Sequence, residues 1–248
     1  VAREVGVDGR LGGQANVPGA SGTWKDLTGN VNLLAANLTT QVRAIAEVAT
    51  AVTKGDLTRS IQVEAKGEVG ELKVNINTMI SNLRETTESN REQDWLKTNL
   101  AKFSGMLQGQ RELRTVGQML LTELAPLINA QQGAIYHLSG GEGDARLKLL
   151  SSYAHDSERV PTVIRPGEGL VGQCALEKKR ILMADVPPDF VTISSSLGAS
   201  PSVNVIVLPV LFEGQTKAVI ELASLQAFGA GSLAFLELLT QSIGAVFN

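Results

Sequence analysis

The sequence contains very little cysteine, histidine or aromatic side chain. Its 248 residues include one cysteine, Cys174, two histidines and 4% aromatic residues. A single cysteine excludes an internal disulfide framework, which fits the reducing conditions of the cytoplasm. So few sulfur and imidazole ligands also argue against a zinc site, and no residue pattern indicates a cofactor.

Long apolar runs and basic stripes are missing as well. No stretch approaches the ~20 apolar residues of a membrane span, so we expect no span in this sequence. The net charge is −3 and the longest basic run is 178–180, which we expect to close a helix. Nucleic acid is therefore not an expected partner. The hydrophobic content of 43% is enough for one large domain or two small ones.

Apolar residues recur in steps of three and four residues through the first half of the sequence. This spacing predicts helices in a coiled-coil-like bundle. We expect the seam to run without a break and to be shared by two parallel copies of the chain. Its members are Leu27, Val31, Leu34, Leu38, Val42, Ile45, Ala49 and Val52, and then Leu72, Ile76, Met79 and Leu83.

The two seams also belong to an internal repeat. Residues 26–38 (DLTGNVNLLAANL) align with residues 71–83 (ELKVNINTMISNL) at an offset of 45. Five pairs are identical in this alignment: Leu27/Leu72, Asn30/Asn75, Asn32/Asn77, Asn37/Asn82 and Leu38/Leu83. Further back, GRL at 9–11 pairs with GDL at 55–57. The sequence therefore contains a repeat whose first copy lacks its opening helix.

A connector interrupts the helical pattern between residues 55 and 67. A tight helical hairpin needs only a few residues, and this connector is longer. Stretched at ~3.3 Å per residue, it is long enough to run back along a helix of ~20 Å, which would make the flanking helices parallel. Reach alone does not choose between parallel and antiparallel helices.

This order of a helix, Gly-x-apolar, a strap with a second apolar residue, and Glu-x-Gly before another helix resembles a HAMP domain. The resemblance implies a parallel four-helix bundle in a homodimer that relays signals. It covers residues 41–88 as a full copy and 1–40 as a partial one. The signalling and packing residues that it implies are Gly55, Leu57, Val63 (or Ile61), Glu68, Gly70, Leu72, Ile76 and Asn77.

Residues 89–111 predict a linking coiled-coil helix. Polar residues fill its first part, and apolar spacing returns at Leu96, Leu100, Phe103 and Leu107, shifted against the earlier seam. A shifted, polar segment suits a joint that passes rotation or register change between domains. A plain solvated spacer explains it equally well.

The second half alternates helical and strand patterns. A helix is expected over 113–127, followed by hairpins at 133–154 and 203–224, a short helix near 167–177, a strand at 181–186 and a closing helix over 231–247. Residues 187–202 are rich in turn formers, so we expect a loop or broken helix there. The pattern predicts an α+β domain with a central antiparallel sheet.

Residues 165–186 (RPGEGLVGQCALEKKRILMADV) and the hairpin VLPVLFEGQTKAVIELAS make the region 112–248 resemble a GAF domain. The family places any ligand pocket between the sheet and the loop–helix segments. The pocket residues that this implies are Tyr136, Leu170, Cys174, Phe190 and Ile193, although an ordinary packed core explains them at least as well. The ligand itself is unknown.

No residue pattern predicts catalysis. Cys174 lacks a base nearby in sequence, and the redox enzymes of the GAF family need several cysteines. His137 and His155 stand alone, and structural or surface roles are more common for such histidines than haem ligation. The stretch PGEG lacks the Gly-Lys-Ser/Thr ending of a P-loop. We therefore expect no enzyme in this sequence.

The order of a partial HAMP, a full HAMP, a linking helix and a GAF domain resembles the cytoplasmic input region of a bacterial hybrid sensor histidine kinase of a two-component system. This implies a parallel homodimer whose kinase domain follows in the same chain. Two alternatives stay open. One is a small-molecule-binding GAF regulator of a nucleotide cyclase or phosphodiesterase. The other is a module that holds a nucleotide or tetrapyrrole for its own sake.

Overall fold

The computed structural model describes residues 2–110, 112–141, 143–154, 160–184, 186–187, 192–195, 198–201 and 204–248. The chain forms two compact units, Val1–Arg91 and Glu92–Asn248. In the described part of the chain, none of the helices has the length and apolar character needed to cross a membrane.

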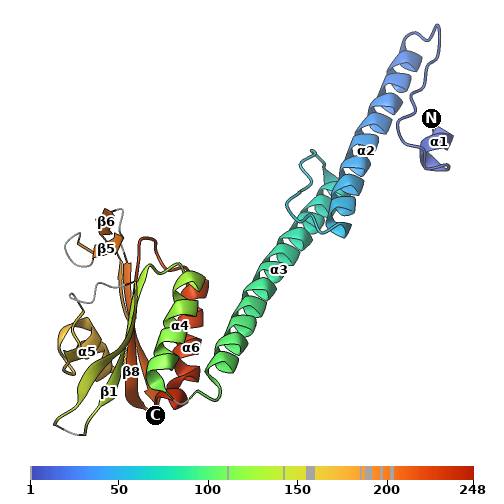
Figure 1. Cartoon of the computed structure of the whole chain (residues 1–248). Helices are drawn as coiled ribbons and strands as arrows, with labels where there is room; N and C mark the ends of the chain where they lie inside the picture. The colour runs from blue at the N-terminus through green and yellow to red at the C-terminus, as the bar shows by residue number, and fades with distance from the viewer. Residues whose placement is uncertain are drawn as a thin grey trace. The chain divides into compact units, whose positions relative to one another are not determined.

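The first unit is helical. After the short helix α1 (Ala2–Gly6), helix α2 (Thr23–Thr53) is joined by the connector 54–66 to helix α3 (Gly67–Leu107), and α3 runs past the boundary of the unit. The connector leaves the end of α2 and turns back along it. Its residue Glu64 reaches the middle of α2, where the Glu64 carbonyl accepts a hydrogen bond of 3.2 Å from Gln41 Nε2. Helix α3 starts there and runs in the direction of α2 (Figure 1). The parallel arrangement of the two helices that flank the connector is confirmed.

The seam along α2 is not uniform, so the expectation of an unbroken heptad does not hold. Leu34, Leu38 and Val42 follow one another in two successive steps of four residues. Such a stutter shifts the apolar stripe around the helix. The stripe therefore has one register before Leu38 and another after Val42, and the two registers correspond to the two copies of the repeat.

The second unit is built on a six-stranded sheet in which all pairs of neighbours are antiparallel. The strand order is β3-β2-β1-β8-β7-β4. The strands are β1 (Gln132–Ser139), β2 (Arg146–Tyr153), β3 (Val163–Ile164), β4 (Ile181–Ala184), β7 (Asn204–Phe212) and β8 (Gln215–Ser224). The expected α+β fold with a central antiparallel sheet is confirmed.

Helices cover both faces of this sheet. Helices α4 (Leu113–Leu127) and α6 (Ala230–Ser242) lie on one face, and α5 (Gly169–Glu177) lies on the other (Figure 1). Because strand side chains alternate between faces, each strand contributes to two cores. Ile135 and Ile220 belong to the core under α4 and α6, and Tyr136 and Val219 belong to the core under α5.

The end of α3 belongs to the first of these cores. Phe103 is fully buried, and Trp95 packs against the same cluster. The Phe235 ring of α6 makes edge-on contacts with both, at centroid distances of 5.4 Å to Trp95 and 5.6 Å to Phe103. Lys102 adds an ion pair of 2.6 Å with Glu123 of α4. The apolar spacing of this segment is therefore used for packing within the second unit.

Two of the differences from the sequence-based expectation lie in the second half of the chain. In the region expected as a loop or broken helix, β5 (Thr192–Ser195) and β6 (Gly198–Pro201) form a small antiparallel pair; the β-branched residues of β5 favour extended backbone. The closing helix ends at Ser242 and continues as the 3-10 turn η1 (Gly244–Phe247). A Cβ at Gly244 would lie 1.9 Å from the Leu211 carbonyl oxygen, so this backbone rests directly on β7.

Candidate functional site

Two glycines of the predicted motif allow the connector to form. Gly55 follows the end of α2 with a φ of 82°, in the left-handed region that glycine adopts without steric cost. Gly70 lies in the first turn of α3, where a Cβ would come within 2.8 Å of the Ala65 carbonyl oxygen. The first glycine lets the chain leave α2, and the second lets it pass close to the start of α3.

Apolar side chains hold the connector against the helix pair. Ile61 is only 1% exposed and forms a buried cluster with Val48 of α2 and Ile80 of α3. The other members of this cluster are partly buried: Ile45, Val52, Leu57, Val63 and Ile76. Of the two alternatives for the second apolar residue of the strap, Ile61 is the more deeply buried, and Val63 packs beside it.

The side chain of Asn77 fixes the connector by hydrogen bonding to the main chain of the connector. The Asn77 Oδ1 accepts a hydrogen bond of 2.8 Å from the Ile61 N–H, and its Nδ2 donates one of 3.1 Å to the Ile61 carbonyl. One carboxamide thus satisfies both main-chain groups of a residue whose side chain is buried. We call this arrangement the asparagine clamp.

The first copy of the repeat contains a second asparagine clamp. The Asn32 Oδ1 accepts a hydrogen bond of 2.7 Å from the Ala15 N–H, and its Nδ2 donates one of 2.9 Å to the Ala15 carbonyl. Asn32 is the repeat partner of Asn77. The repeat seen in the sequence therefore has a structural counterpart in its most specific contact.

Three further contacts to the connector were not anticipated from the sequence. Arg84 Nε donates to the Leu57 carbonyl over 3.0 Å, and Lys73 Nζ donates to the Val63 carbonyl over 3.0 Å. The third contact is that of Gln41 with the Glu64 carbonyl. All three are made by long polar side chains that reach backbone oxygens. Such contacts leave no periodic signal, although Arg84 is the residue directly after the aligned repeat.

We predict that Asn77→Ala loosens the connector. The substitution leaves the N–H and carbonyl of Ile61 without partners, which costs about 1–3 kcal/mol. Hydrogen exchange at the Ile61 amide should become roughly 10-fold or more faster. Asn75→Ala, at an exposed position on the same helix, is the matched control. Unchanged protection of Ile61 would contradict the clamp.

Two of the predicted residues point away from this cluster. Glu68 is exposed in the first turn of α3, where a negative charge is favourable to the helix dipole. Leu72 is 46% exposed. Its repeat partner Leu27 is 52% exposed, so both copies leave the same apolar position uncovered within one chain.

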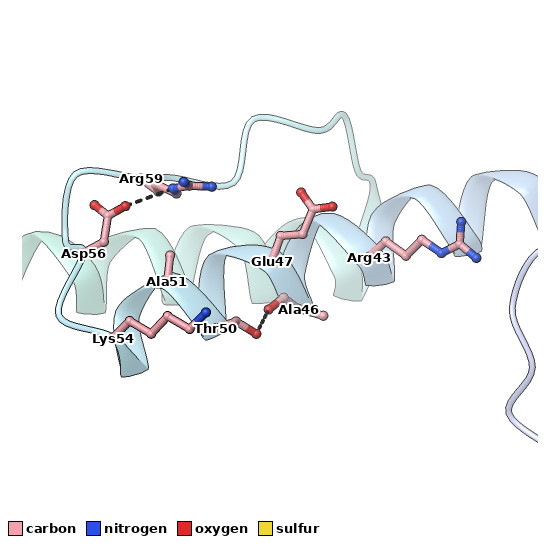
Figure 2. A pocket seen from close by; sticks show the side chains of 8 residues that line it. All are labelled: Arg43, Ala46, Glu47, Thr50, Ala51, Lys54, Asp56 and Arg59. Carbon is pink, nitrogen blue, oxygen red and sulfur yellow. Dashed lines mark hydrogen bonds and ion pairs between the residues drawn. The ribbon is translucent and has the colours of Figure 1, made fainter.

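A shallow groove of about 450 Å³ follows α2 and the start of the connector. Figure 2 shows its lining residues, which are Arg43, Ala46, Glu47, Thr50, Ala51, Lys54, Asp56 and Arg59. The Thr58 hydroxyl and N–H and the Arg59 guanidinium donate to Asp56 and lower the pKa of that carboxyl. Charges of both signs line the groove, so it selects no ligand of one charge.

The expected pocket residues of the second unit lie in or beside the core under α5. Tyr136 and Cys174 are buried in it, and Leu170 packs against it. Ile193 lies on β5, whereas Phe190 falls outside the described residues. Burial raises the pKa of the Cys174 thiol to about 12, which keeps it protonated and a poor nucleophile.

Only one of the two histidines lies within the described residues. His137 lies on β1, and His155 falls outside the described residues. Within the described ranges, histidine, cysteine, aspartate and glutamate side chains do not gather in groups of three or more that could hold a metal ion.

Two family models match this chain. The HAMP domain matches residues 33–85, around the Asn77 clamp, and the GAF domain matches residues 110–248. The GAF match covers more than half of the chain, so the chain belongs to the GAF domain family and carries a HAMP domain before its GAF domain. Both are regulatory domains, and together they define a signalling sensor and relay region.

Several solved structures are similar to part of this chain. The GAF domain of a phosphoenolpyruvate-protein phosphotransferase from Coxiella burnetii is 17% identical, with a TM-score of 0.50 over 60% of this chain and 90% of that chain. The corresponding GAF domain from Acinetobacter is 17% identical, with a TM-score of 0.48 over 60% and 89%. The free methionine-R-sulfoxide reductase of Neisseria meningitidis is 20% identical, with a TM-score of 0.48 over 60% and 85%.

Proposed function

We propose that this chain is the sensory input and relay region of a two-component sensor histidine kinase. The GAF domain, or domains before the HAMP region, would bias the packing of a parallel helical bundle, and the bundle would control a kinase domain in the same chain. The observation that carries this proposal is the connector held by Asn77 between two parallel helices. In the proposed dimer, this helix pair would supply half of a four-helix bundle from each chain.

The other half would come from a second copy of the chain in parallel register. HAMP domains typically work as dimers, and the seam positions here are uncovered within one chain. Leu34 is 68% exposed and its repeat partner Met79 is 49% exposed. Apolar side chains at regular helical spacing gain free energy when a partner helix removes them from water.

We further propose that the first 40 residues act as a partial HAMP unit, because their Asn32 clamp repeats that of Asn77. Helix α2 would then serve both units, as the last helix of the first and the first helix of the second. The stutter between Leu38 and Val42 marks the exchange. A shift of packing in one unit would be passed to the next through this shared helix.

Cysteine cross-linking tests the parallel dimer and the relay together. In a parallel bundle, Leu83→Cys should form a disulfide with its own copy in the partner, and Asn82→Cys, one position around the helix, should cross-link several-fold less. The disulfide should also fix the autophosphorylation of the full-length protein in one state. Cross-links only in a mixture of Leu72→Cys and Leu83→Cys chains would indicate antiparallel packing and contradict the proposal.

A further inference from the structure

The face of the sheet under α5 carries a charged residue at its centre. Glu221 lies on β8, directly opposite Ala134 of β1 and Val207 of β7. The residues around it on this face are apolar and buried, Val219 and Ala223 among them. The position is partly buried, and loss of hydration raises the pKa of the Glu221 carboxyl to about 6. Among the described residues, no donor or cation contacts this carboxylate.

A second acceptor without a partner lies beside it. Gln132 is 2% exposed, and its Oε1 is buried with no hydrogen-bond partner among the described residues. Gln132 alternates with Ala134 and Tyr136 along β1, so all three face α5. Since Ala134 is opposite Glu221, Gln132 is the diagonal neighbour of Glu221 across the strand pair, within reach of long side chains.

The strand register places small side chains opposite both acceptors. Gln132 is opposite Ala223 and Glu221 is opposite Ala134, so each long polar side chain faces a methyl group. On the other diagonal of Glu221 lies Tyr136, and the Glu221 charge adds to the burial that raises the pKa of its hydroxyl. A carboxylate, an amide oxygen and a phenol thus share one apolar face.

Buried acceptors without donors are costly, and a charged one most of all. The Oε1 of Gln132 is such a buried acceptor, and the partly buried carboxylate of Glu221 beside it also lacks a donor among the described residues. Two neighbouring acceptors, one of them negative, are complemented by a group with several N–H donors and a positive charge. Amidinium, guanidinium and primary ammonium groups have this chemistry.

We propose that this face of the GAF domain binds a small organic cation, with its charged nitrogen group on Glu221, a further N–H on the Oε1 of Gln132, and its apolar body against Tyr136. The proposal rests on the sensing role given to the GAF domain above and adds the chemical class of the ligand. It does not depend on the dimer or on the kinase output.

Binding of three cationic probes to the 248-residue chain tests this proposal. The probes are benzamidine, agmatine and tyramine. Their binding is measured by calorimetry and by the change in Tm on thermal unfolding. At least one should bind the wild type and raise its Tm, and Glu221→Gln should weaken that binding at least 10-fold. Glu213→Gln, at the exposed tip of the β7–β8 hairpin, removes the same charge and should bind as the wild type does.

Two further measurements keep the result clear. Gln132→Leu should also weaken binding, and unliganded Glu221→Gln should be folded with an unchanged or higher Tm, because it no longer buries a charge. Benzamide, the neutral analogue of benzamidine, should bind at least 10-fold more weakly. The proposal is overturned if no probe prefers the wild type to Glu221→Gln, or if benzamide binds as tightly as benzamidine. A failed cross-link at Leu83 would leave these results unaffected.

Discussion

Phe103→Ala should destabilise the second unit by about 3–5 kcal/mol, the usual cost of removing a fully buried phenylalanine side chain. Phe103 is 0% exposed. Its loss would open a cavity beside Phe235 and remove an edge-on ring contact, which adds about 0.5–1.5 kcal/mol beyond the area buried. Since domains of this size are stable by about 5–15 kcal/mol, this is a large fraction of the total.

Urea unfolding of the chain measures this effect. Ser104→Ala, the exposed neighbour on the same helix, is the control and should change the free energy of unfolding by less than about 0.5 kcal/mol. If Phe103→Ala were as mild as Ser104→Ala, the end of α3 would not be part of the GAF core. The linking segment 89–111 would then be a plain solvated spacer, the alternative that its polar first part also allows.

Leu72→Asp should dissociate the proposed dimer while leaving the single chain folded. Leu72 is 46% exposed in the chain, so the aspartate stays hydrated in the monomer. In a parallel bundle, two such carboxylates would be buried near each other, at a cost of several kcal/mol. Each 1.4 kcal/mol weakens association tenfold, so we expect self-association to fall by about 100-fold or more.

Sedimentation velocity at several concentrations measures this change. Thr78→Asp is the control, because Thr78 lies on the same helix, is exposed, and stands outside the seam. A dimer that persists at the same concentrations for Leu72→Asp would exclude this seam as the interface. Ile76→Asp is a weaker test, since Ile76 already packs in the intrachain cluster and its substitution would also disturb the monomer.

Much of the first unit could be predicted because its features are local. The glycines at 55 and 70, the connector and the second helix follow each other within a short stretch, and the repeat pointed to Asn32 and Asn77. The length of the connector does not determine the direction of α3. The contact between Gln41 and Glu64 shows it. The spacing within the seam is also informative, because the step of four residues from Leu38 to Val42, where a heptad has three, changes which face of α2 is apolar.

Glu221 shows what the sequence did not reveal. In the stretch QTKAVIELAS it reads as one polar residue in a strong strand. Its position becomes informative only when β8 is placed beside β1, a strand some 80 residues earlier in the chain, so that Gln132 comes next to it. The residues named for the pocket from the family resemblance included Tyr136 and missed these two acceptors, because pairing over such a sequence distance has no periodic signature.

The two asparagine clamps hold backbone groups, and this has a consequence for how the connectors can change. Every residue except proline offers the N–H and carbonyl that Asn32 and Asn77 hold, and the held residues are as different as Ala15 and Ile61. The sequence separations also differ, at 17 and 16 residues. The same asparagine contact can therefore hold connectors of different length and with a different residue at the held position, provided that this residue is not proline.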